Sequence, residues 1–352
     1  IFNMAKSLAL YLTDHYLAFS EVDKNDAQVI FTIAFSHADF EQKLRDFLGK
    51  PQVGVISIFI DVMGEEIRHE HIPHIGAQDR DRLLARKFRS LFPTADLTWK
   101  QHLEREKDGR KDDIYLLLGV TLPTMAKQAI DILIESKQQV RGVYFLPVLQ
   151  QQLRTLLPEI PQYLIISSIP GSQQNKKNYR QTFYKKSTLA VSRLTTASAE
   201  SEQEMFDQLF KEIERTYQFL DGTRQLDQSK PLNVIVMLKE HDSACLIDHS
   251  SNVNIDLSYA SLAELAQKLG INNDEVYHDL PELLCQHAIR KNIQPHAQPV
   301  EICRQHRVSR VKQRLYFSSV GVVVISLMVA AGLWLSAQQE SERYALLLSQ
   351  IT

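Results

Sequence analysis

The segment Leu8–Val22 reads LALYLTDHYLAFSEV, and its pattern favours a β-sheet at the start of this chain. Two apolar runs, Leu8–Leu12 and Tyr16–Val22, flank the polar triplet Thr13-Asp14-His15. Runs of this kind on either side of a few turn-forming residues are typical of a β-hairpin. We therefore expect two antiparallel strands with a tight turn between them.

Further strands and helices alternate downstream of this hairpin. Gly54–Val62, GVISIFIDV, is apolar almost without interruption, as expected of a buried strand, and Ile114–Val120 has the same character. A third strand is expected over Val29–Ala34. Helices are expected over Asp39–Phe47, Asp79–Leu91, Thr124–Ser136 and Pro147–Leu157.

A second block with the same order of elements begins near Tyr163. Its strands are expected over Tyr163–Ile169, Tyr179–Tyr184, Ser187–Leu194, Leu232–Leu238 and Ala244–Ile247. Its helices are expected over Glu204–Leu220, Ser261–Leu269 and Val276–Lys291, the last kinked or broken near Pro281. Two α/β blocks that each open with a hairpin and close with helices imply a repeated architecture. This inference rests on the order of elements alone.

The composition indicates a globular protein with no general affinity for nucleic acid. The chain has 352 residues, of which 44% are hydrophobic and 23% charged, and its formal net charge is -2. This length suggests two domains of about 150 residues each, and a nucleic-acid binder would show a basic excess. Cys245, Cys285 and Cys303 are odd in number and lack paired spacing, so neither a disulfide framework nor a zinc site is predicted.

One segment departs from this soluble pattern. Phe317–Leu335, FSSVGVVVISLMVAAGLWL, contains no charged residue. About 20 apolar residues in a helix cross a ~30 Å hydrocarbon core, and a buried core helix rarely stays apolar on every face for this length. We therefore predict a transmembrane helix over residues 316–336 that lies in the lipid bilayer. This helix could also pair with a second copy of itself and form a homodimer.

The charges beside that helix predict its orientation. Basic residues precede it without an acid among them: Arg304, Arg307, Arg310, Lys312 and Arg314. Because lysine and arginine stay on the cytoplasmic side, the N-terminal part is expected in the cytoplasm. Residues 292–315 are expected to be a linker and basic juxtamembrane segment, and residues 337–352 the start of an extracytoplasmic helix.

The order of elements resembles the two-lobed actin-like (ribonuclease H-like) α/β fold. More narrowly, the chain is similar to the inner-membrane assembly proteins of bacterial type IV pilus and type II secretion systems, the PilM/GspL-like family. This resemblance implies lobe 1 over residues 5–158, lobe 2 over residues 159–291 and a single transmembrane helix. It is carried by LALYLTDHYLAFSEV, GVISIFIDVMGEEIRHEHIPHI, QDRDRLLARKF, REKDGRKDDIYLLLGVTLP, LIISSIPGSQQNKKNYRQTFYKKSTLAVSRLTT and EMFDQLFKEIERTYQFLDGTR.

The chain departs from actin-like ATPases at the residues that would bind nucleotide. Those enzymes hold the phosphates with two Asp-x-Gly hairpins, in which aspartate positions the metal and water and glycine lets backbone N–H groups approach. Tyr11 and Thr13 stand at these positions of the first hairpin, and Ser167 and Ser168 lie in the second, which lacks aspartate. Lys239–Asp242 replaces the Gly-Gly adenosine loop. We therefore expect no catalytic residues, no cofactor and no ATP hydrolysis.

The histidine-rich segment HEHIPH admits a metal-binding interpretation. His69 and His71 would share one face of a strand, and imidazole suits zinc or copper. Pro73 breaks regular structure, however, and no fourth ligand lies nearby in sequence. We therefore favour solvated histidines and predict no metal. Four hairpin lysines are interpreted as solvent-exposed, with contact to anionic lipid as the alternative: Lys176, Lys177, Lys185 and Lys186.

The leading functional hypothesis is a structural role. The resemblance implies a bitopic inner-membrane scaffold whose cytoplasmic domain docks the hexameric assembly ATPase and whose helix pairs with small bitopic membrane proteins. Two alternatives remain open: an active actin-like ATPase with unusual phosphate loops, and a one-pass transmembrane signalling protein. The near-neutral charge counts against a DNA-binding output domain and predicts no nucleic-acid partner.

Overall fold

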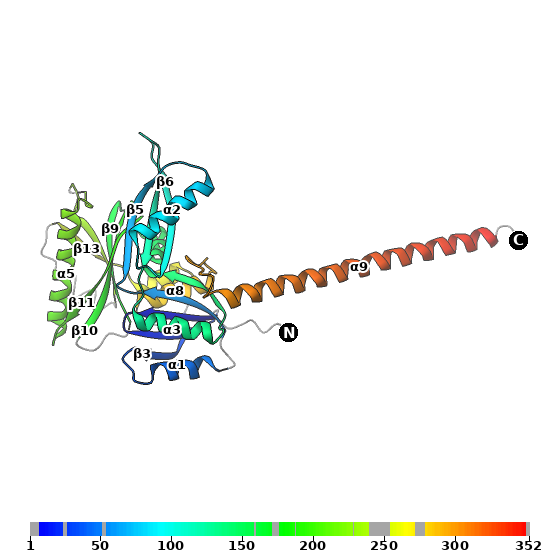
Figure 1. The fold of residues 1–352 in the computed structure, drawn as a ribbon, viewed down its shortest axis with the longest axis horizontal. Coiled ribbons are helices and arrows are strands. Elements are labelled where there is room, and N and C mark those ends of the chain that lie inside the picture. Colours follow the sequence, from blue (N-terminus) through cyan, green and yellow to red (C-terminus); the bar gives the residue numbers. More distant parts are fainter. Residues whose placement is uncertain are drawn as a thin grey trace. The chain divides into compact units, whose positions relative to one another are not determined.

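The computed structural model describes residues 7–23, 27–50, 54–157, 160–170, 176–186, 188–227, 229–238, 254–271 and 279–349. The chain forms two compact units, Ile1–Cys303 and Arg304–Thr352. In the described part of the first unit, helices pack on three β-sheets, and the described residues of the second unit form one long helix (Figure 1).

The first sheet has the strand order β3-β2-β1-β4-β8. Neighbouring strands of β1, β2 and β3 are antiparallel, whereas β4 runs parallel to β1 and β8 runs parallel to β4. The predicted hairpin is confirmed, and so is the buried strand within Gly54–Val62. The bounds are β1 (Ser7–Thr13), β2 (Tyr16–Val22), β3 (Ala27–Ala34), β4 (Val55–Asp61) and β8 (Val140–Phe145).

The second sheet repeats the first, with the strand order β11-β10-β9-β12-β13. It has the same combination of antiparallel and parallel neighbours. The repeated architecture is therefore confirmed, and the fold is mixed α/β with the duplicated sheet expected of an actin-like protein. The bounds are β9 (Gln162–Ser168), β10 (Lys176–Lys185), β11 (Thr188–Ser198), β12 (Leu232–Met237) and β13 (Ile255–Tyr259).

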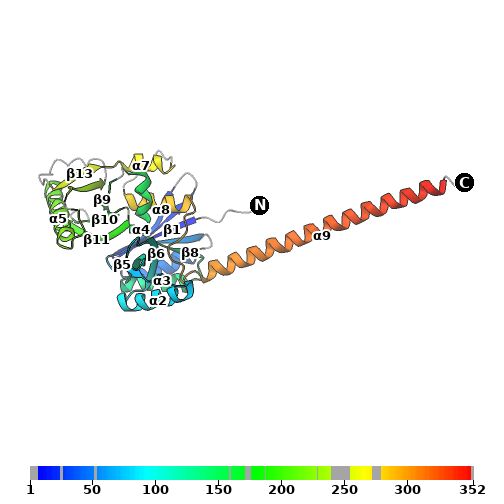
Figure 2. The same cartoon turned by 90° about the horizontal axis from the view of Figure 1, so that it is seen from above.

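Alternate residues of the second sheet face two different hydrophobic cores. Leu164 and Ile166 pack with the long helix α5 (Glu202–Gly222), while Tyr163 and Ile165 belong to the larger core shared with the first sheet. The two-residue period of a strand explains this division. Figure 2 shows α5 on the outer side of this sheet.

The larger core is completed by helices from both halves of the first unit. α1 contributes the inward face that the sequence predicts, with Phe40, Leu44 and Phe47 buried. α8 begins with Pro281 in its first turn, where a proline lacks only an N–H that would have no helical partner. The bounds are α1 (Phe40–Leu48), α3 (Thr124–Glu135), α4 (Leu146–Gln150), the 3₁₀ helix η1 (Gln151–Leu156), α7 (Leu262–Lys268) and α8 (Leu280–Arg290).

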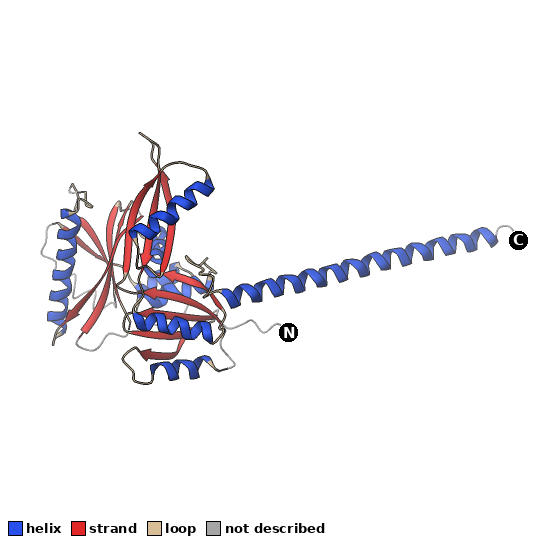
Figure 3. Ribbon diagram, in the orientation of Figure 1, coloured by secondary structure: helices blue, strands red, loops and turns tan. Residues whose placement is uncertain are grey.

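A third, antiparallel sheet has the strand order β5-β7-β6 and carries helix α2 (Figure 3). It has a small core of its own, in which Leu84 of α2 packs on Tyr115 and Leu117 of β7. β6 was not predicted, because charged and polar residues dominate its sequence LTWKQHLER. The bounds are β5 (Glu65–Ile72), α2 (Ala77–Leu91), β6 (Leu97–Arg105) and β7 (Asp113–Val120).

Residues 292–303, here called the strap, lie against strand β8. Val143 and Ala297 exchange two backbone hydrogen bonds of 2.8 and 3.1 Å. The approach is so close that a Cβ atom on Gly142 would lie 2.4 Å from Cβ of Pro295. The first part of the predicted linker is therefore bound to the first sheet.

The second unit is helix α9 (Arg304–Ser349). Its segment Arg304–Gln339 is long and apolar enough to cross a membrane, by length and composition. Serine hydroxyls within it donate to carbonyl oxygens of the same helix, so they need no other partner in an apolar medium. The predicted span 316–336 lies inside this segment.

The structure differs from the predicted elements in two further places. The helix predicted over Val276–Lys291 begins at Leu280, and β13 was not predicted. The predicted strand Ala244–Ile247 lies outside the described residues.

Candidate functional site

The turn of the first hairpin satisfies its own backbone groups. The Thr13 hydroxyl accepts hydrogen bonds from the N–H groups of His15 and Tyr16, at 3.2 and 3.1 Å, and donates to the Tyr16 carbonyl at 2.9 Å. Threonine side chains commonly stabilise turns in this way. The backbone N–H groups that a glycine turn could offer to a phosphate are therefore already bound.

The corresponding serines of the second hairpin are also engaged within the protein. Ser167 is fully buried, and its hydroxyl accepts a hydrogen bond from Nε2 of Gln150 at 3.4 Å. The Ser168 hydroxyl donates to the carboxylate of Asp279, just before α8. Both serines thus link the first strand of the second sheet to the helices of the larger core.

The two hairpins touch each other directly. The Tyr16 hydroxyl donates to the Pro170 carbonyl at 2.5 Å. One cavity beside this contact, lined by Thr13, Asp14, Asp61 and neighbouring residues of both hairpins, has a volume of about 30 Å³. Another, lined by Tyr16 and Pro170 together with residues of β2, β3 and α8, measures about 400 Å³. The smaller volume suits about one water molecule. The larger one falls in the range of ligand pockets, roughly 300–1,000 Å³, but its described lining contains two carboxylates and no lysine, arginine or histidine that could bind phosphates.

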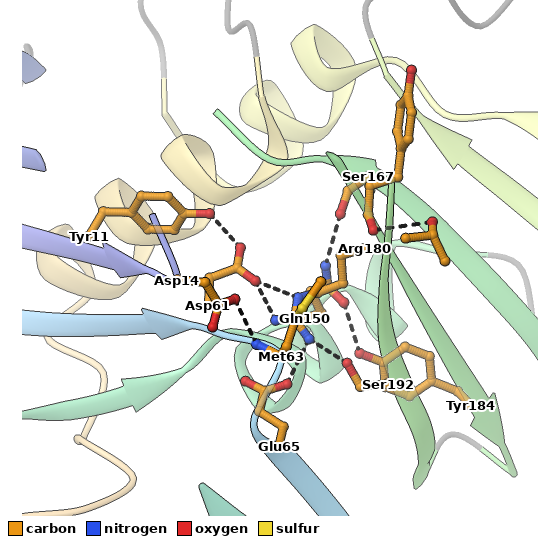
Figure 4. Close-up of polar contacts among 12 residues, drawn as sticks. Tyr11, Asp14, Asp61, Met63, Glu65, Gln150, Ser167, Arg180, Tyr184 and Ser192 are labelled. Carbon is orange, nitrogen blue, oxygen red and sulfur yellow. Dashed lines mark hydrogen bonds and ion pairs between the residues drawn. The ribbon is translucent and has the colours of Figure 1, made fainter. Parts of the chain in front are cut away.

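A buried cluster of charges joins the two five-stranded sheets next to the smaller cavity (Figure 4). Arg180 of β10 donates from Nε to Asp61 Oδ1 at 2.7 Å and from Nη1 to Glu65 Oε2 at 2.7 Å, and a second bond to Asp61 comes from Nη2. The exposed fractions of the three side chains are 1% for Arg180, 0% for Asp61 and 2% for Glu65. Burial of charge at this depth is tolerated only when the charges are paired.

Neutral groups complete the cluster. The Tyr11 hydroxyl donates to the other carboxylate oxygen of Asp61, and Ser192 accepts from Arg180. Glu65 Oε1 is buried and has no hydrogen-bond partner among the described residues. The cluster therefore holds two carboxyl groups and one guanidinium, which gives an excess negative charge when both acids are ionised.

The pKa values reflect this imbalance. Burial raises the pKa of Glu65 to about 7, although the nearby Arg180 opposes the shift. Burial and the charge of Asp61 raise the pKa of Tyr11 well above its ordinary value, so its hydroxyl stays a donor. Burial disfavours the charge of Arg180, but Asp61 and Glu65 outweigh it and raise the guanidinium pKa. The pKa of Glu65 is therefore brought close to neutral pH.

A further carboxylate, Asp14, lies at the rim of the smaller cavity. It accepts a hydrogen bond from the Met63 backbone N–H at 2.9 Å, and so ties the hairpin turn to the end of β4. Burial raises its pKa. Asp14 therefore has a structural contact that accounts for its position.

The structure brings together the four positions singled out in the two hairpins: Tyr11, Thr13, Ser167 and Ser168 lie on β1 and β9 around the same junction. The residues replacing the adenosine loop, Lys239–Asp242, lie outside the described residues. The basic residues predicted before the membrane span are exposed and lie in α9: Arg304, Arg307, Arg310, Lys312 and Arg314.

Sequence reasoning missed the charge cluster itself. The sequence does contain an indication of the cluster, because Asp61 ends a strand that is otherwise apolar and Arg180 lies between aromatic residues of a buried strand. A charged side chain in such a strand is buried, and a buried charge normally has an oppositely charged partner on another element.

Two side chains of the histidine segment lie within hydrogen-bonding distance of carboxylates. His71 Nδ1 lies 2.8 Å from Glu106, and His74 Nδ1 lies 2.9 Å from Asp113. Within the described ranges, no group of three or more histidine, cysteine, aspartate or glutamate side chains is placed to hold a metal ion. Of the hairpin lysines, Lys185 donates to the Gln225 carbonyl at 2.6 Å.

Comparisons with known proteins yield solved structures only. No protein-family model matches the chain, and no curated protein sequence matches it. The chain is similar to the PilM-PilN type IV pilus biogenesis complex, with 11% identity and a TM-score of 0.47, over 83% of this chain and 100% of that one. It is also similar to a Bacteroides thetaiotaomicron protein with an actin-like ATPase fold and unknown function, with 11% identity and a TM-score of 0.41, over 73% and 94% of the two chains. A third similar structure is the cytoplasmic domain of EpsL, an inner membrane component of the type II secretion system of Vibrio cholerae, with 11% identity and a TM-score of 0.37, over 81% and 95%.

Proposed function

We propose that this protein is a single-pass inner-membrane scaffold of a type IV pilus or type II secretion assembly platform, and that it does not hydrolyse ATP. Its first unit would dock a cytoplasmic assembly ATPase, and α9 would cross the membrane and pair with small bitopic proteins. The choice of these two kinds of assembly system rests on the resemblance that the sequence shows to their inner-membrane proteins.

The observation that carries the proposal is the closed junction between the two hairpins. Thr13 binds the turn N–H groups, Tyr16 bonds to Pro170, and the cavity between the two turns measures about 30 Å³. The pocket of about 400 Å³ on the other side of this contact has no lysine, arginine or histidine in its described lining to bind phosphates. The Arg180 cluster then fixes the two sheets to each other. A fold closed in this way favours a rigid docking body over an enzyme that must open and close around nucleotide.

The strap and α9 support the membrane part of the proposal. The strap is hydrogen-bonded to β8 and leads directly into α9. Arg304–Gln339 has the length and composition of a membrane span. The basic residues at the start of α9 favour a cytoplasmic location for the first unit.

Purification of the tagged full chain from its native host in a mild detergent tests the proposal. Mass spectrometry should identify a hexameric ATPase and small bitopic membrane proteins of one assembly system. In a control chain, residues 317–335 are replaced by leucines, which keeps an apolar membrane-spanning helix but removes its specific side chains. This chain should still co-purify with the ATPase but should lose the partners that pair through the helix. Recovery of transcription factors or signalling enzymes alone would instead support a one-pass signalling protein.

Addition of Mg-ATP to the purified chain tests the nucleotide part separately. We expect no change in the thermal unfolding midpoint and no release of phosphate. A rise of the midpoint by several degrees, as ligands that bind only the native state produce, would mean that the junction opens and would contradict this part of the proposal.

A further inference from the structure

A larger cavity lies away from the hairpin junction. It measures about 600 Å³ and is formed where the third sheet meets the turn between β10 and β11 and the 3₁₀ helix η1. This volume falls in the range of ligand-binding pockets, roughly 300–1,000 Å³. The lining residues used below come from all three of these elements.

The lining of this cavity is basic. Arg154, Lys185 and Lys186 contribute three permanent positive charges, and Glu104 is the one carboxylate among the described lining residues. His69 and His102 also line it, but burial lowers the pKa of His69, so the positive charge of the lining rests on the arginine and the lysines. An excess of positive charge in a concave site attracts a negatively charged ligand.

Two features of the backbone place these cations. The Lys185 ammonium is held by the Gln225 carbonyl at 2.6 Å. Lys186 has a φ angle of 48°, in the left-handed region that few non-glycine residues adopt, and its N–H donates to the Pro161 carbonyl at 2.7 Å. Lys185 and Lys186, adjacent in the chain, are therefore both held in place at the wall of the cavity.

The lining also contains an acceptor that needs a donor. Oε1 of Gln101 is buried and has no hydrogen-bond partner among the described residues. Buried acceptors normally have a partner, and a phosphate group ionised at neutral pH offers few donors, whereas a peptide offers backbone N–H groups. Leu103, Ile114 and Ala190 add apolar surface that suits the methylene groups of long acidic side chains.

We propose that this cavity binds a carboxylate-rich peptide segment of a protein partner. Arg154, Lys185 and Lys186 pair with its carboxylates, and Gln101 accepts from its backbone. The site is separate from the hairpin junction, and its assignment does not depend on which assembly system the protein serves.

Binding of labelled peptides to the full chain in detergent micelles tests this proposal. The probes are a fluorescent hexaglutamate peptide that carries a photo-reactive group and its hexaglutamine counterpart. The Arg154→Glu/Lys186→Glu variant should weaken hexaglutamate binding by about tenfold or more, because attraction becomes repulsion. The matched control is Arg86→Glu/Arg89→Glu on the exposed face of α2, which should change the affinity by less than about twofold.

The position of photo-crosslinks decides where the peptide binds. Crosslinks to residues 101–104 or 185–190 are expected. Crosslinks confined to the basic residues at the start of α9, or equal losses in the cavity variant and its control, would overturn the assignment. Displacement of hexaglutamate by inorganic phosphate at equal carboxylate and phosphate concentration would assign the cavity to a phosphate-bearing ligand and likewise overturn it. A circular dichroism spectrum and an unfolding midpoint unchanged by the substitutions would show that the variants are folded.

Discussion

The first unit contains two junctions that respond to pH in opposite directions. The charge cluster of Asp61, Glu65 and Arg180 joins the two large sheets, whereas the strap joins β8 to the chain that continues into α9. The cluster relies on buried charge, and the strap relies on neutral hydrogen bonds and ring contacts around His296. The cluster is the acid-stabilised junction, since it contributes more stability at low pH. The strap is the base-stabilised junction, since it contributes more stability at higher pH.

Glu65 makes the cluster less stable as pH rises. Its pKa is raised from 4.5 to about 7 in the folded protein, mainly by burial. Between these values the folded state binds more protons than the unfolded state, so the free energy of unfolding falls as pH increases. A shift of this size corresponds to at most about 3.5 kcal/mol. The loss is complete above the folded pKa.

His296 makes the strap less stable as pH falls. Its ring stacks on Phe145, and Nδ1 accepts from the Phe145 backbone N–H at 2.9 Å. Burial lowers its pKa from 6.5 to about 4. Between these values the unfolded state binds more protons, so the free energy of unfolding rises with pH over this window. Between about pH 4.5 and 6.5 the two groups change the free energy of unfolding in opposite directions. In the native chain the two effects therefore offset each other when the unfolding of the whole chain is measured against pH.

Arg180→Met is the change with the largest expected effect on this comparison. It leaves two carboxyl groups buried without their cation, and such losses cost about 3–5 kcal/mol. Urea unfolding of the full chain in detergent, followed by Trp99 fluorescence in a Trp334→Phe background, would measure it. The matched control is Arg193→Met on the neighbouring strand β11, whose pair with Glu212 is partly exposed and should cost less than about 1 kcal/mol. Equal losses in the two variants would show that the cluster does not hold the sheets together.

Glu65→Gln should isolate the acid-stabilised junction. Glutamine can still accept from Arg180 Nη1 but cannot ionise. Near pH 8 the variant should be more stable than the native chain by about 2 kcal/mol, and the difference should vanish near pH 4.5. The exposed Glu66→Gln change, on the adjacent residue of β5, is the control and should leave the pH profile unchanged. A native-like slope in Glu65→Gln would mean that Glu65 titrates at its ordinary pKa.

The sequence predicted the fold better than it predicted these two junctions. The hairpin at Leu8–Val22 and the apolar strands carry local periodicity, and this periodicity was sufficient to find the repeated sheets. The partnership of Asp61 with Arg180 joins residues far apart in the chain, and no local pattern reports such a contact. The strap contains Pro295 and Pro299, which indicate a linker by composition, yet its hydrogen bonds to β8 depend on tertiary contact.

The four hairpin positions show the same limit. The absence of aspartate and glycine at Tyr11, Thr13, Ser167 and Ser168 can be read from the sequence. The hydrogen-bond partners of these side chains cannot be read from the sequence, because Asp61, Gln150 and Asp279 come from other parts of the chain. Only Thr13 bonds within its own turn, and this is the contact that turn chemistry could have predicted.

His296→Asn has the smallest expected effect and tests the strap. The asparagine oxygen can take the position of Nδ1 and accept from the Phe145 N–H, so the main loss is the ring contact, about 0.5–1.5 kcal/mol near pH 7. The variant should also lose the rise in stability between pH 4 and 6.5 that the native histidine produces. Hydrogen exchange of residues 140–145 in the full chain would measure this locally, with His37→Asn in the exposed loop before α1 as the control. If hydrogen exchange in β8 kept its native pH dependence in the His296→Asn variant, a group other than His296 would cause that dependence. The strap would then not be the base-stabilised junction.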